Sequence, residues 1–470
     1  MSGRRKTHGE ARVQESDPSR SVNGWAGVDD VALPQLSFDT EGGARLTHQV
    51  FRFPAKFHPP VISRLIEDYS RPGERVIDIF CGSGTLLVEA AARNRHAVGI
   101  DVDPLSVFLS RAKSQSFSMR SFRLAADHLL ERTQRLARSN DEYERRMHVD
   151  LDGDEYARQS RKLAVPEIPN LEHWFRKYVV VDLARLRGEI DAVKAPPAVS
   201  DALRLVFASI IRGASNADPV PVSGLERTRH MISRDAAGRM INPFRLFEKK
   251  LIKATADFQQ FQDVRSGSAC HARVGDATQR LQIRAREPIH AAITSPPYHG
   301  AVDYYRRHQL EMFWLGLTST QAERLAILDR YLGRPHARQR HPFVVDADLR
   351  AWPEVAALET AIRKTSVRRA NEFRHYCTGM AHAFTRLAEV LPAKAPAIFI
   401  VGHSRWNGTE LPTSELFREL ASPLFELSEQ YWYPVKNRHM SYGRHNGANI
   451  DREYALVFRR TRKSVRPGPR

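Results

Sequence analysis

The chain has 470 residues, 42% of them hydrophobic and 9% aromatic, which is enough for two or three domains' worth of core. Its 72 Lys and Arg outnumber its 54 Asp and Glu, and the formal charge of +18 favours a polyanionic partner over a merely soluble basic protein. The three cysteines form no C-x-x-C pair and no apolar run has transmembrane length, so we expect a cytoplasmic protein without disulfides, metal or membrane contact.

The N-terminal third predicts a leader followed by a βαβ unit. Residues 1–47 are polar and predict a loosely ordered leader. "FRFPAKFHPPVISRLIEDY" then reads as a proline-broken segment followed by a helix. "RVIDIF" predicts a buried strand, "CGSG" a tight turn, "TLLVEAAARN" a helix and "AVGIDVDP" a second strand that ends in carboxylates. Strand, turn, helix and strand in this order imply a parallel sheet.

The next segment, residues 115–269, has few strand signals and predicts a helical insertion. "DALRLVFASIIRG" and "FRLFEKKLIKATADFQQF" read as helices. "LEHWFRKYVVVDLARLRGEI" predicts one helix, whose apolar stripe is Leu171, Trp174, Phe175, Tyr178, Leu183, Leu186 and Ile190.

Strand patterns return after the insertion, in "HARVGDA", "AAITSPPY", "APAIFIVGH" and "REYALVFRR". "RRANEFRHYCTGMAHAFTRLAEVL" predicts a helix before the third of them. We therefore predict one α/β domain, split by the insertion into residues 48–114 and 270–460, and a basic tail at 461–470.

The turn "CGSG" places Gly82 and Gly84 after a buried strand, where glycine permits a sharp turn and the close approach of a ligand. A dinucleotide fingerprint would need a third glycine where Leu87 stands, and a P-loop would need a lysine after its last glycine. Both phosphate-binding motifs are thus incomplete. Asp101 can accept hydrogen bonds from ribose hydroxyls, while a helix cap at Asp101 or Asp103 is the structural alternative.

The stretch "AAITSPPYHG" ends an apolar strand with two prolines. Proline lacks a backbone N–H and fixes φ, so Ser295 and Pro296 are held extended and their carbonyls cannot enter a ladder or a helix. These acceptors, the Ser295 hydroxyl and the ring of Tyr298 could receive an amino group and the face of a planar heterocycle. For the proline pair by itself, a strand that ends in a polar loop is the simpler explanation.

Together these motifs resemble a known family. "DIFCGSGT" with "GIDVDP" is similar to the S-adenosylmethionine-binding segment of DNA methyltransferases, and "TSPPY" to the catalytic motif of those that methylate exocyclic amines. "FPAKFHPP" resembles the element that closes their cofactor pocket, and "TSPPYHGAVDYYRRHQLEMFWLG" the continuation in a bacterial cytosine-N4-specific group. The resemblance covers residues 50–114 and 270–460. It implies a Rossmann-like class I methyltransferase fold, with a doubly wound, mainly parallel seven-stranded sheet and target recognition in the insertion.

The resemblance also implies roles for single residues. S-adenosylmethionine would contact the pocket-closing element, the glycine turn and three strand ends, at Pro54, Ala55, Lys56, Asp78, Phe80, Gly82, Gly84, Asp101 and Asp276. Among these, Asp276 would approach the adenine, although an Asp that ends a strand is more often a turn residue. The target base would be received by Ser295, Pro296, Pro297 and Tyr298.

The chemistry of an exocyclic amine fits the proline motif. Its lone pair is delocalised into the ring, and hydrogen bonds to Ser295 Oγ and the Pro296 carbonyl would favour a pyramidal, nucleophilic nitrogen in line with the methyl group. Because the amine is buried in a duplex, the base must be flipped out, and Tyr298 would stack on it. No cysteine follows a proline, so cysteine-dependent C5 methylation does not fit.

Ser295 favours cytosine N4 as the target, because adenine-N6 enzymes of the family usually carry Asp or Asn at this position. Double-stranded DNA is the expected partner, and a restriction or defence protein would be a separate polypeptide. Adenine N6 remains the first alternative. An RNA amino-methyltransferase and a nucleic-acid-binding protein without catalysis are the others.

Two basic segments could contact DNA. The first contains Arg306, Arg307 and His308, and the second contains Tyr442, Arg444 and Asn446. The structural alternative for the first segment is a helix whose apolar side, Leu310, Phe313 and Trp314, packs in the core. The alternative for the second is an ordinary surface loop.

Overall fold

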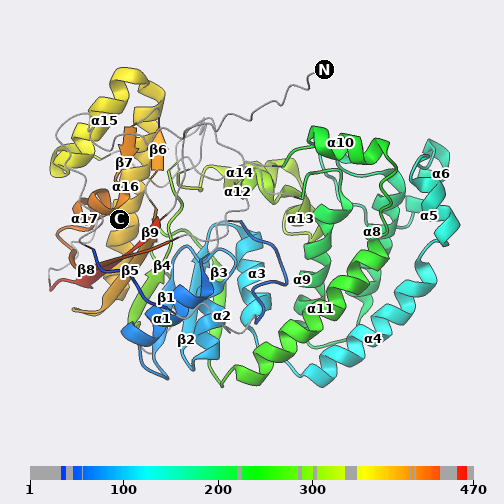
Figure 1. The fold of residues 1–470 in the computed structure, drawn as a ribbon, viewed down its shortest axis with the longest axis horizontal. Helices are drawn as coiled ribbons and strands as arrows, with labels where there is room; N and C mark the ends of the chain where they lie inside the picture. Colours follow the sequence, from blue (N-terminus) through cyan, green and yellow to red (C-terminus); the bar gives the residue numbers. More distant parts are fainter. Residues whose placement is uncertain are drawn as a thin grey trace, which may run out of the picture.

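The structure is a computed structural model and describes residues 33–38, 46–54, 57–219, 225–283, 288–299, 304–333, 344, 347–402, 404–406, 409–434 and 452–462. The predictions made for Ala55, Lys56, Tyr442, Arg444 and Asn446, and for most of the leader and the tail, lie outside these residues. Figure 1 shows two parts side by side, a sheet flanked by helices and a group of helices that includes α4, α8, α9 and α11.

Seven strands form one sheet in the order β3-β2-β1-β4-β5-β9-β8. Their bounds are β1 Arg75–Asp78, β2 His96–Asp101, β3 Cys270–Val274, β4 Ala291–Thr294, β5 Pro396–Val401, β8 Phe425–Pro434 and β9 Arg452–Arg460. The first five run parallel, and β9 is antiparallel to both β5 and β8. This order, with a single antiparallel strand next to the edge, is that of the class I methyltransferase fold and confirms the predicted fold. A separate hairpin joins β6 Ser404–Trp406 to β7 Thr409–Leu411.

Helices cover both faces of the sheet, which explains the continuous apolar strands. The helices of this part are α1 Pro59–Tyr69, α2 Thr85–Ala92, α3 Pro104–Ser114, α15 Pro353–Thr365, α16 Val367–Val390 and α17 Thr413–Ala421, with a short 3-10 turn at Leu349–Ala351. Along β4 and β5, Ile293 and Ile398 join the core under α1 and α2, whereas Ala292 and Phe399 join the core under α16. The sheet is therefore doubly wound, as predicted.

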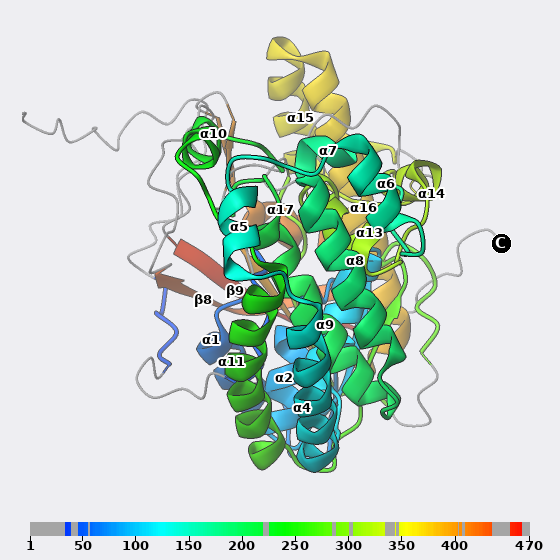
Figure 2. The same ribbon diagram turned by 90° about the vertical axis from the view of Figure 1, so that its right-hand side faces the viewer.

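The insertion is helical, and no strand interrupts residues 115–219 or 225–269. Its helices are α4 Met119–Leu136, α5 Asn140–Arg146, α6 Gly153–Ser160, α7 Leu171–Trp174, α8 Lys177–Ala192, α9 Pro197–Ala214, α10 Arg229–Ala236 and α11 Pro243–Val264. Figure 2 shows α4, α8, α9 and α11 packed together as long helices. Their core extends beyond the insertion, because it includes Phe108 of α3 and Trp314 of α13.

The segment that follows "TSPPY" therefore packs on the helical part. It forms α12 Tyr304–Arg307, α13 Gln309–Trp314 and α14 Gln321–Leu328. The Trp314 ring centroid lies 5.9 Å from that of Phe175 and 6.2 Å from that of Phe207. Leu310 and Phe313 are buried as well. The alternative that the sequence left open, an apolar helix side in the core, thus describes this segment.

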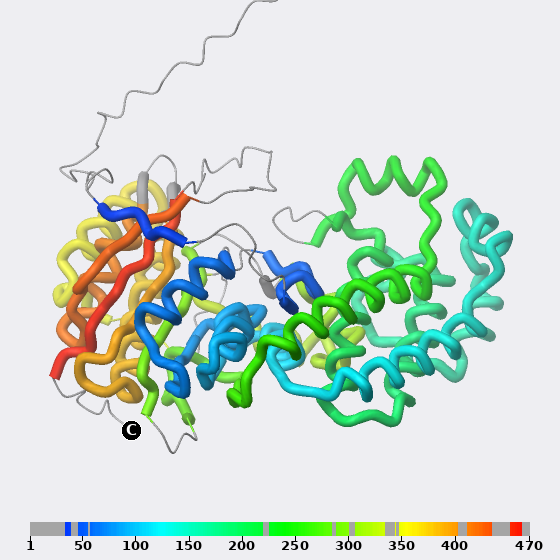
Figure 3. Tube along the Cα trace, turned by 60° about the horizontal axis from the view of Figure 1, so that its bottom comes forward, coloured from blue at the N-terminus to red at the C-terminus, as the bar shows by residue number. Residues whose placement is uncertain are grey.

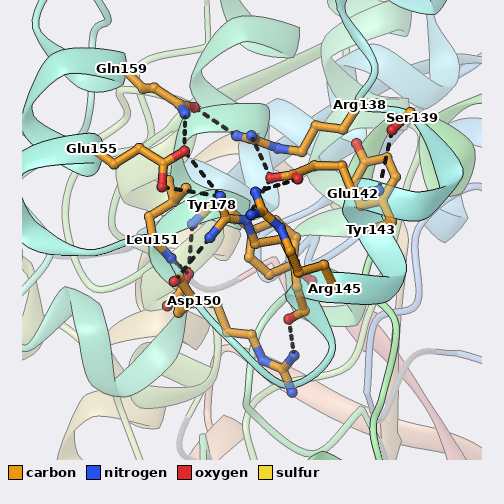
Figure 4. Close-up of polar contacts among 12 residues, drawn as sticks. Arg138, Ser139, Glu142, Tyr143, Arg145, Asp150, Leu151, Glu155, Gln159 and Tyr178 are labelled. Atoms are coloured by element: carbon orange, nitrogen blue, oxygen red, sulfur yellow. Dashed lines mark hydrogen bonds and ion pairs between the residues drawn. The ribbon is translucent and has the colours of Figure 1, made fainter.

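One predicted helix is interrupted. The pattern over residues 171–190 predicts a single helix, but α7 ends at Trp174 and Phe175 is extended, with φ −139° and ψ 145°. Asp150 accounts for the break, because its Oδ2 accepts a hydrogen bond from Lys177 N at 2.8 Å and its Oδ1 one from Tyr178 N at 3.1 Å. These bonds cap two N–H groups at the start of α8. Figure 4 shows Asp150 and Tyr178 within a wider polar network.

Part of the predicted loose leader is ordered. Residues 33–38 lie along the edge strand β8, where Leu36 N donates to Trp432 O at 2.9 Å and Trp432 N donates to Pro34 O at 3.3 Å (Figure 3). Leu36 is only 6% exposed. The unpaired backbone groups of an edge strand, together with the apolar side chains of Leu33, Leu36 and Phe38, explain why this segment lies there.

Among the described helices, none combines the length and the apolar character that a membrane span requires.

Candidate functional site

Four parallel strands bring the predicted site residues to one edge of the sheet. Asp78 and Asp101 end β1 and β2, Asp276 lies just past β3, and Ser295 directly follows β4. The strand order runs outward from β1 in one direction and from β4 in the other. Such a reversal leaves a crevice at the carboxyl ends of the strands, where α/β proteins bind ligands.

The glycine turn after β1 has the conformation predicted for it. Gly82 and Gly84 have φ values of 47° and 83°, in the left-handed region that favours glycine. A Cβ atom at Gly84 would lie 2.6 Å from the Cα of Ser110, so this glycine also lets α2 approach α3. Gly82 N donates a hydrogen bond of 2.9 Å to Asp101 Oδ2, which ties the turn to the end of β2.

Asp78 joins the turn to the predicted catalytic motif. Its side chain is 0% exposed, and its Oδ1 accepts hydrogen bonds from Phe80 N at 3.0 Å and from Thr294 Oγ1 at 2.6 Å. Its Oδ2 has no hydrogen-bond partner among the described residues. Burial raises the pKa of Asp78 to about 7, and the nearby Asp101 carboxylate adds to the shift. Thr294 immediately precedes Ser295, so a hydrogen bond joins the predicted cofactor-binding segment directly to the "SPPY" segment.

Asp101 also has a raised pKa. Its Oδ1 accepts a hydrogen bond from Asp103 N at 3.0 Å. Shielding from water, followed by the neighbouring Asp103 carboxylate, raises the pKa of Asp101 to about 7. The cap of α3 is Asp103, whose Oδ1 accepts from Leu105 N at 2.8 Å. The helix-cap alternative thus applies to Asp103, while the carboxylate of Asp101 faces the glycine turn.

Asp276 has the contacts of a turn residue. Its Oδ1 accepts hydrogen bonds from Thr278 N at 2.9 Å and from Thr278 Oγ1 at 2.7 Å. Arg330 Nε lies 3.9 Å from Asp276 Oδ2. Its predicted contact with adenine remains a prediction.

The segment before α1 lies against the glycine turn. A Cβ atom built on Gly82 would lie 3.6 Å from Phe53 Cε1, and Pro54 is the next residue. The rings of Phe53 and His308 are 4.9 Å apart. "FPAKF" therefore begins beside the turn, as its resemblance to a pocket-closing element implies.

The "SPPY" residues directly follow β4 and belong to no helix or strand. The Pro297 carbonyl accepts a hydrogen bond of 3.0 Å from the hydroxyl of Tyr376 in α16. Within the described part of the chain, neither Ser295 Oγ nor the Pro296 carbonyl has a hydrogen-bond partner, and Ser295 is partly exposed. The acceptors predicted for an amino group are thus available, and α16 fixes the backbone one residue further on.

Part of the chain is similar to known methyltransferase sequences. Residues 22–107 match the family model N6_N4_Mtase, described as DNA methylase. The chain is a relative of the DNA amino-methyltransferases. Residues 68–152 also match a model described as RMKL-like, methyltransferase domain. The resemblance inferred from the motifs is thereby confirmed, whereas its cytosine-N4 subgroup is not decided.

Two curated proteins are similar to part of this chain. Type II methyltransferase M.MjaII of Methanocaldococcus jannaschii is 23% identical over 146 residues, which are 31% of this chain and 24% of that protein. Type II methyltransferase M.MvaI of Kocuria varians is 27% identical over 160 residues, 33% of this chain and 32% of that protein. The matched region thus spans a quarter to a third of each relative.

Solved structures give only distant matches. TrmN from Thermus thermophilus has a TM-score of 0.29 at 8% identity, covering 86% of this chain and 49% of that one. The rRNA methyltransferase aviRa from Streptomyces viridochromogenes has a TM-score of 0.30 at 11% identity, covering 87% and 88%. The fold assignment therefore rests on the strand order of the sheet.

Two of the residues predicted to contact DNA, Arg307 and His308, are buried. Arg307 is 4% exposed, and its carbonyl accepts a hydrogen bond of 3.4 Å from Arg212 Nη1. His308 is 2% exposed, packs on Phe53, and its Nδ1 lies 3.8 Å from Asp103 Oδ2. Arg307 thus faces α9 of the helical part, and His308 faces Phe53 and Asp103 of the sheet part. We therefore no longer expect these two side chains to contact phosphates.

Arg306, in contrast, is exposed and lines a pocket. The pocket has a volume of about 1040 Å³ and lies between α7, residues 225–227 and α12. Trp174, His173, Glu226 and Arg227 are among its other lining residues. It combines aromatic, acidic and basic groups on the helical part, next to the segment that follows the "SPPY" motif.

Three hydrogen bonds of the candidate site could not be predicted from the sequence. Thr294 donates to Asp78, Tyr376 donates to Pro297 O, and Glu453 accepts a hydrogen bond of 3.1 Å from the Tyr298 hydroxyl. Thr294 stands inside the quoted motif, but Tyr376 and Glu453 come from an ordinary helix and an ordinary core strand. Only the tertiary structure brings them to the motif.

Proposed function

We propose that this protein is an S-adenosylmethionine-dependent DNA methyltransferase that modifies the exocyclic amine of a flipped base, specifically cytosine N4. The observation that carries the proposal is the 2.6 Å hydrogen bond from Thr294 to Asp78, which joins the "SPPY" motif to the glycine turn. The match to the DNA methylase family supports the same activity.

The residues of the turn fit this cofactor. S-adenosylmethionine carries a sulfonium and an ammonium group, and the described site offers two carboxylates, Asp78 and Asp101, at adjacent strand ends. The unpartnered Oδ2 of Asp78 is a buried acceptor that a cationic group would satisfy. Phe80, Gly82 and Gly84 would hold the methionine end, and Pro54 would line the facing wall. When bound, the cofactor supplies an electrophilic methyl group.

Ser295 and Pro296 would activate the target amine. Their side-chain and backbone oxygens would accept its two hydrogens, which favours the pyramidal nitrogen that attacks. Tyr376 supports this geometry by occupying the next carbonyl, that of Pro297. The ring of Tyr298 would stack on the flipped base and hold it in line. No covalent bond between protein and base is required.

The choice of cytosine N4 rests on Ser295, since adenine enzymes of the family usually carry Asp or Asn there. We extend the proposal to double-stranded DNA as substrate, bound between the site and the helical part, in a cytoplasmic enzyme. Restriction or defence activity would belong to a separate polypeptide. The RNA enzyme and the inactive binding protein are the competing functions.

Nucleoside mass spectrometry tests the proposal. DNA and total RNA would be analysed from a host that expresses the wild type, Ser295→Ala with Tyr298→Ala, or the exposed control Ser233→Ala. N4-methylcytosine in DNA with the wild type and the control, and none with the double variant, is the expected result. N6-methyladenine would keep the mechanism and change the base. A methylated nucleoside in RNA only, or in neither pool, would contradict the proposal.

A further inference from the structure

Glu453 is a partly buried carboxylate of β9 with two tyrosine donors. Its Oε1 accepts a hydrogen bond of 3.1 Å from the Tyr298 hydroxyl, and its Oε2 one of 2.5 Å from the Tyr433 hydroxyl. Tyr433 stands directly opposite Glu453 in the β8–β9 ladder, whereas Tyr298 belongs to the "SPPY" segment after β4. One carboxylate thus links the antiparallel edge of the sheet to the proposed active-site loop.

A purely structural role would not need this second link. The residues that follow Glu453 in β9, from Tyr454 to Phe458, are buried and mostly apolar. Burying a carboxylate costs free energy that an apolar residue would not cost. The cross-strand pair with Tyr433 satisfies only one of its oxygens, and the other is directed to the loop.

Two other contacts of the loop fix its backbone, whereas the bond to Glu453 is made by the Tyr298 side chain itself. Thr294 is bonded to Asp78 before the motif, and the Pro297 carbonyl is bonded to Tyr376 within it. Neither bond restrains the rotation of the Tyr298 side chain. A hydrogen bond to the hydroxyl at the far end of the ring limits the swing of the side chain about its Cα–Cβ bond, and a ring that stacks on a base must stay in place.

We propose that Glu453 is a positioning residue for methyl transfer, which holds the ring of Tyr298 in the place where the target base stacks on it. The inference rests on the proposed function and adds to it a residue from β9. Because Glu453 acts on the Tyr298 hydroxyl, the variants Tyr298→Phe and Glu453→Leu remove the hydrogen bond and keep the aromatic ring.

The experiment compares Tyr298→Phe, Glu453→Leu, their combination, and Glu453→Gln with the wild type. Tyr433→Phe is the matched control, because it removes the other bond to the same carboxylate and keeps the ring that packs on Phe38 with centroids 5.9 Å apart. The measured quantities are kcat and KM with radiolabelled S-adenosylmethionine and plasmid DNA from an unmethylated host. Thermal unfolding of each variant reports its stability.

We expect Tyr298→Phe and Glu453→Leu each to lower kcat by about tenfold or more, since small displacements of a reacting group are costly. The double variant should be no slower than the slower single variant, because both remove the same interaction. Glu453→Gln, which keeps one acceptor oxygen, should recover part of the rate. Tyr433→Phe should keep the wild-type kcat, even if its stability falls.

Two results would overturn the inference. One is an additive loss in the double variant, and the other is an equal kcat for Tyr298→Phe and Tyr433→Phe. The comparison of Tyr298→Phe with Tyr433→Phe tests the inference even if Glu453→Leu does not fold. If the wild type transfers no methyl group, the proposed function fails and the inference fails with it. An active wild type with unaffected variants would remove the inference only.

Discussion

Two carboxylates with raised pKa values, Asp78 and Asp101, lie at the centre of the candidate site. Each accepts two hydrogen bonds, yet both remain poorly hydrated and close to another carboxylate. Such a pair is unfavourable in the protein by itself. A cationic ligand would change that, which is why the pH dependence of stability and of binding are informative.

For stability, we expect the wild type to lose free energy of unfolding relative to Asp78→Asn as the pH rises. The folded pKa of Asp78 is raised to about 7, above its ordinary value of 3.8, so the folded state binds more protons than the unfolded state between these values. The stabilising contribution of the protonated Asp78 carboxyl is complete below about pH 4 and is lost above about pH 7. It amounts to a few kcal/mol, at about 1.4 kcal/mol per pKa unit. Denaturant titrations of cofactor-free protein at several pH values measure it, and parallel curves for both proteins would contradict it.

For binding, we expect S-adenosylmethionine to bind more weakly as the pH falls below 7. Its cationic groups favour ionised carboxylates, and protonation of Asp78 and Asp101 removes that attraction. The Kd at pH 6 should exceed that at pH 8 by about tenfold. Isothermal titration calorimetry gives both values together with the protons released on binding. A Kd that does not change with pH would show that neither carboxylate meets a cationic group.

The elements that could be predicted from the sequence are those set by local patterns. β1, the glycine turn, α2 and β2 follow from apolar runs and from glycines with positive φ. The break between α7 and α8 depends on Asp150, which is 27 residues before Lys177 in the sequence. β8 was not predicted, because its residues alternate poorly and its edge is covered by residues 33–38. Long-range contacts of this kind leave no local pattern.

The same distinction applies to the site. Asp78, Asp101 and Ser295 could be proposed from the sequence because they stand at or just after the ends of strands that carry recognisable motifs. Tyr376 and Glu453 act on the motif from α16 and β9, where the sequence indicates only a helix and a buried strand. The burial of Arg307 was equally hidden, since it depends on how α12 packs.

Two glycines with similar left-handed φ values, one before β1 and one in the turn between β1 and α2, form a matched pair. Gly84 and Gly73 have φ values of 83° and 86°, but a Cβ atom would lie 2.6 Å from Ser110 Cα at Gly84 and would meet nothing within 4 Å at Gly73. Gly73→Ala should cost about 1–2 kcal/mol of unfolding free energy, the cost of a left-handed residue. Gly84→Ala should cost clearly more, because α2 and α3 must also separate. Equal costs in urea unfolding would refute the close packing of the turn.

The net charge of +18 belongs to the sequence as a whole, so it does not by itself locate the proposed DNA substrate. The pocket beside α12 is a more specific indication, because it lies where the segment after the "SPPY" motif joins the helical part. Its lining is aromatic, acidic and basic, which suits the edges and faces of bases better than it suits a row of phosphates. DNA that reaches the site from the helical part would pass this pocket.

We therefore expect Arg306→Ala to weaken DNA binding more than Arg64→Ala. The two variants remove the same charge, but Arg64 lies on α1 of the sheet part, paired with Asp68 at 2.7 Å. If Arg306 contacts a phosphate, the slope of log Kd against log salt should decrease by about 1. If it reads a base, the slope should stay constant while the preference among DNA sequences weakens. Fluorescence anisotropy with duplex oligonucleotides at several salt concentrations distinguishes these results. Equal affinities of the two variants would place the DNA elsewhere on the basic surface.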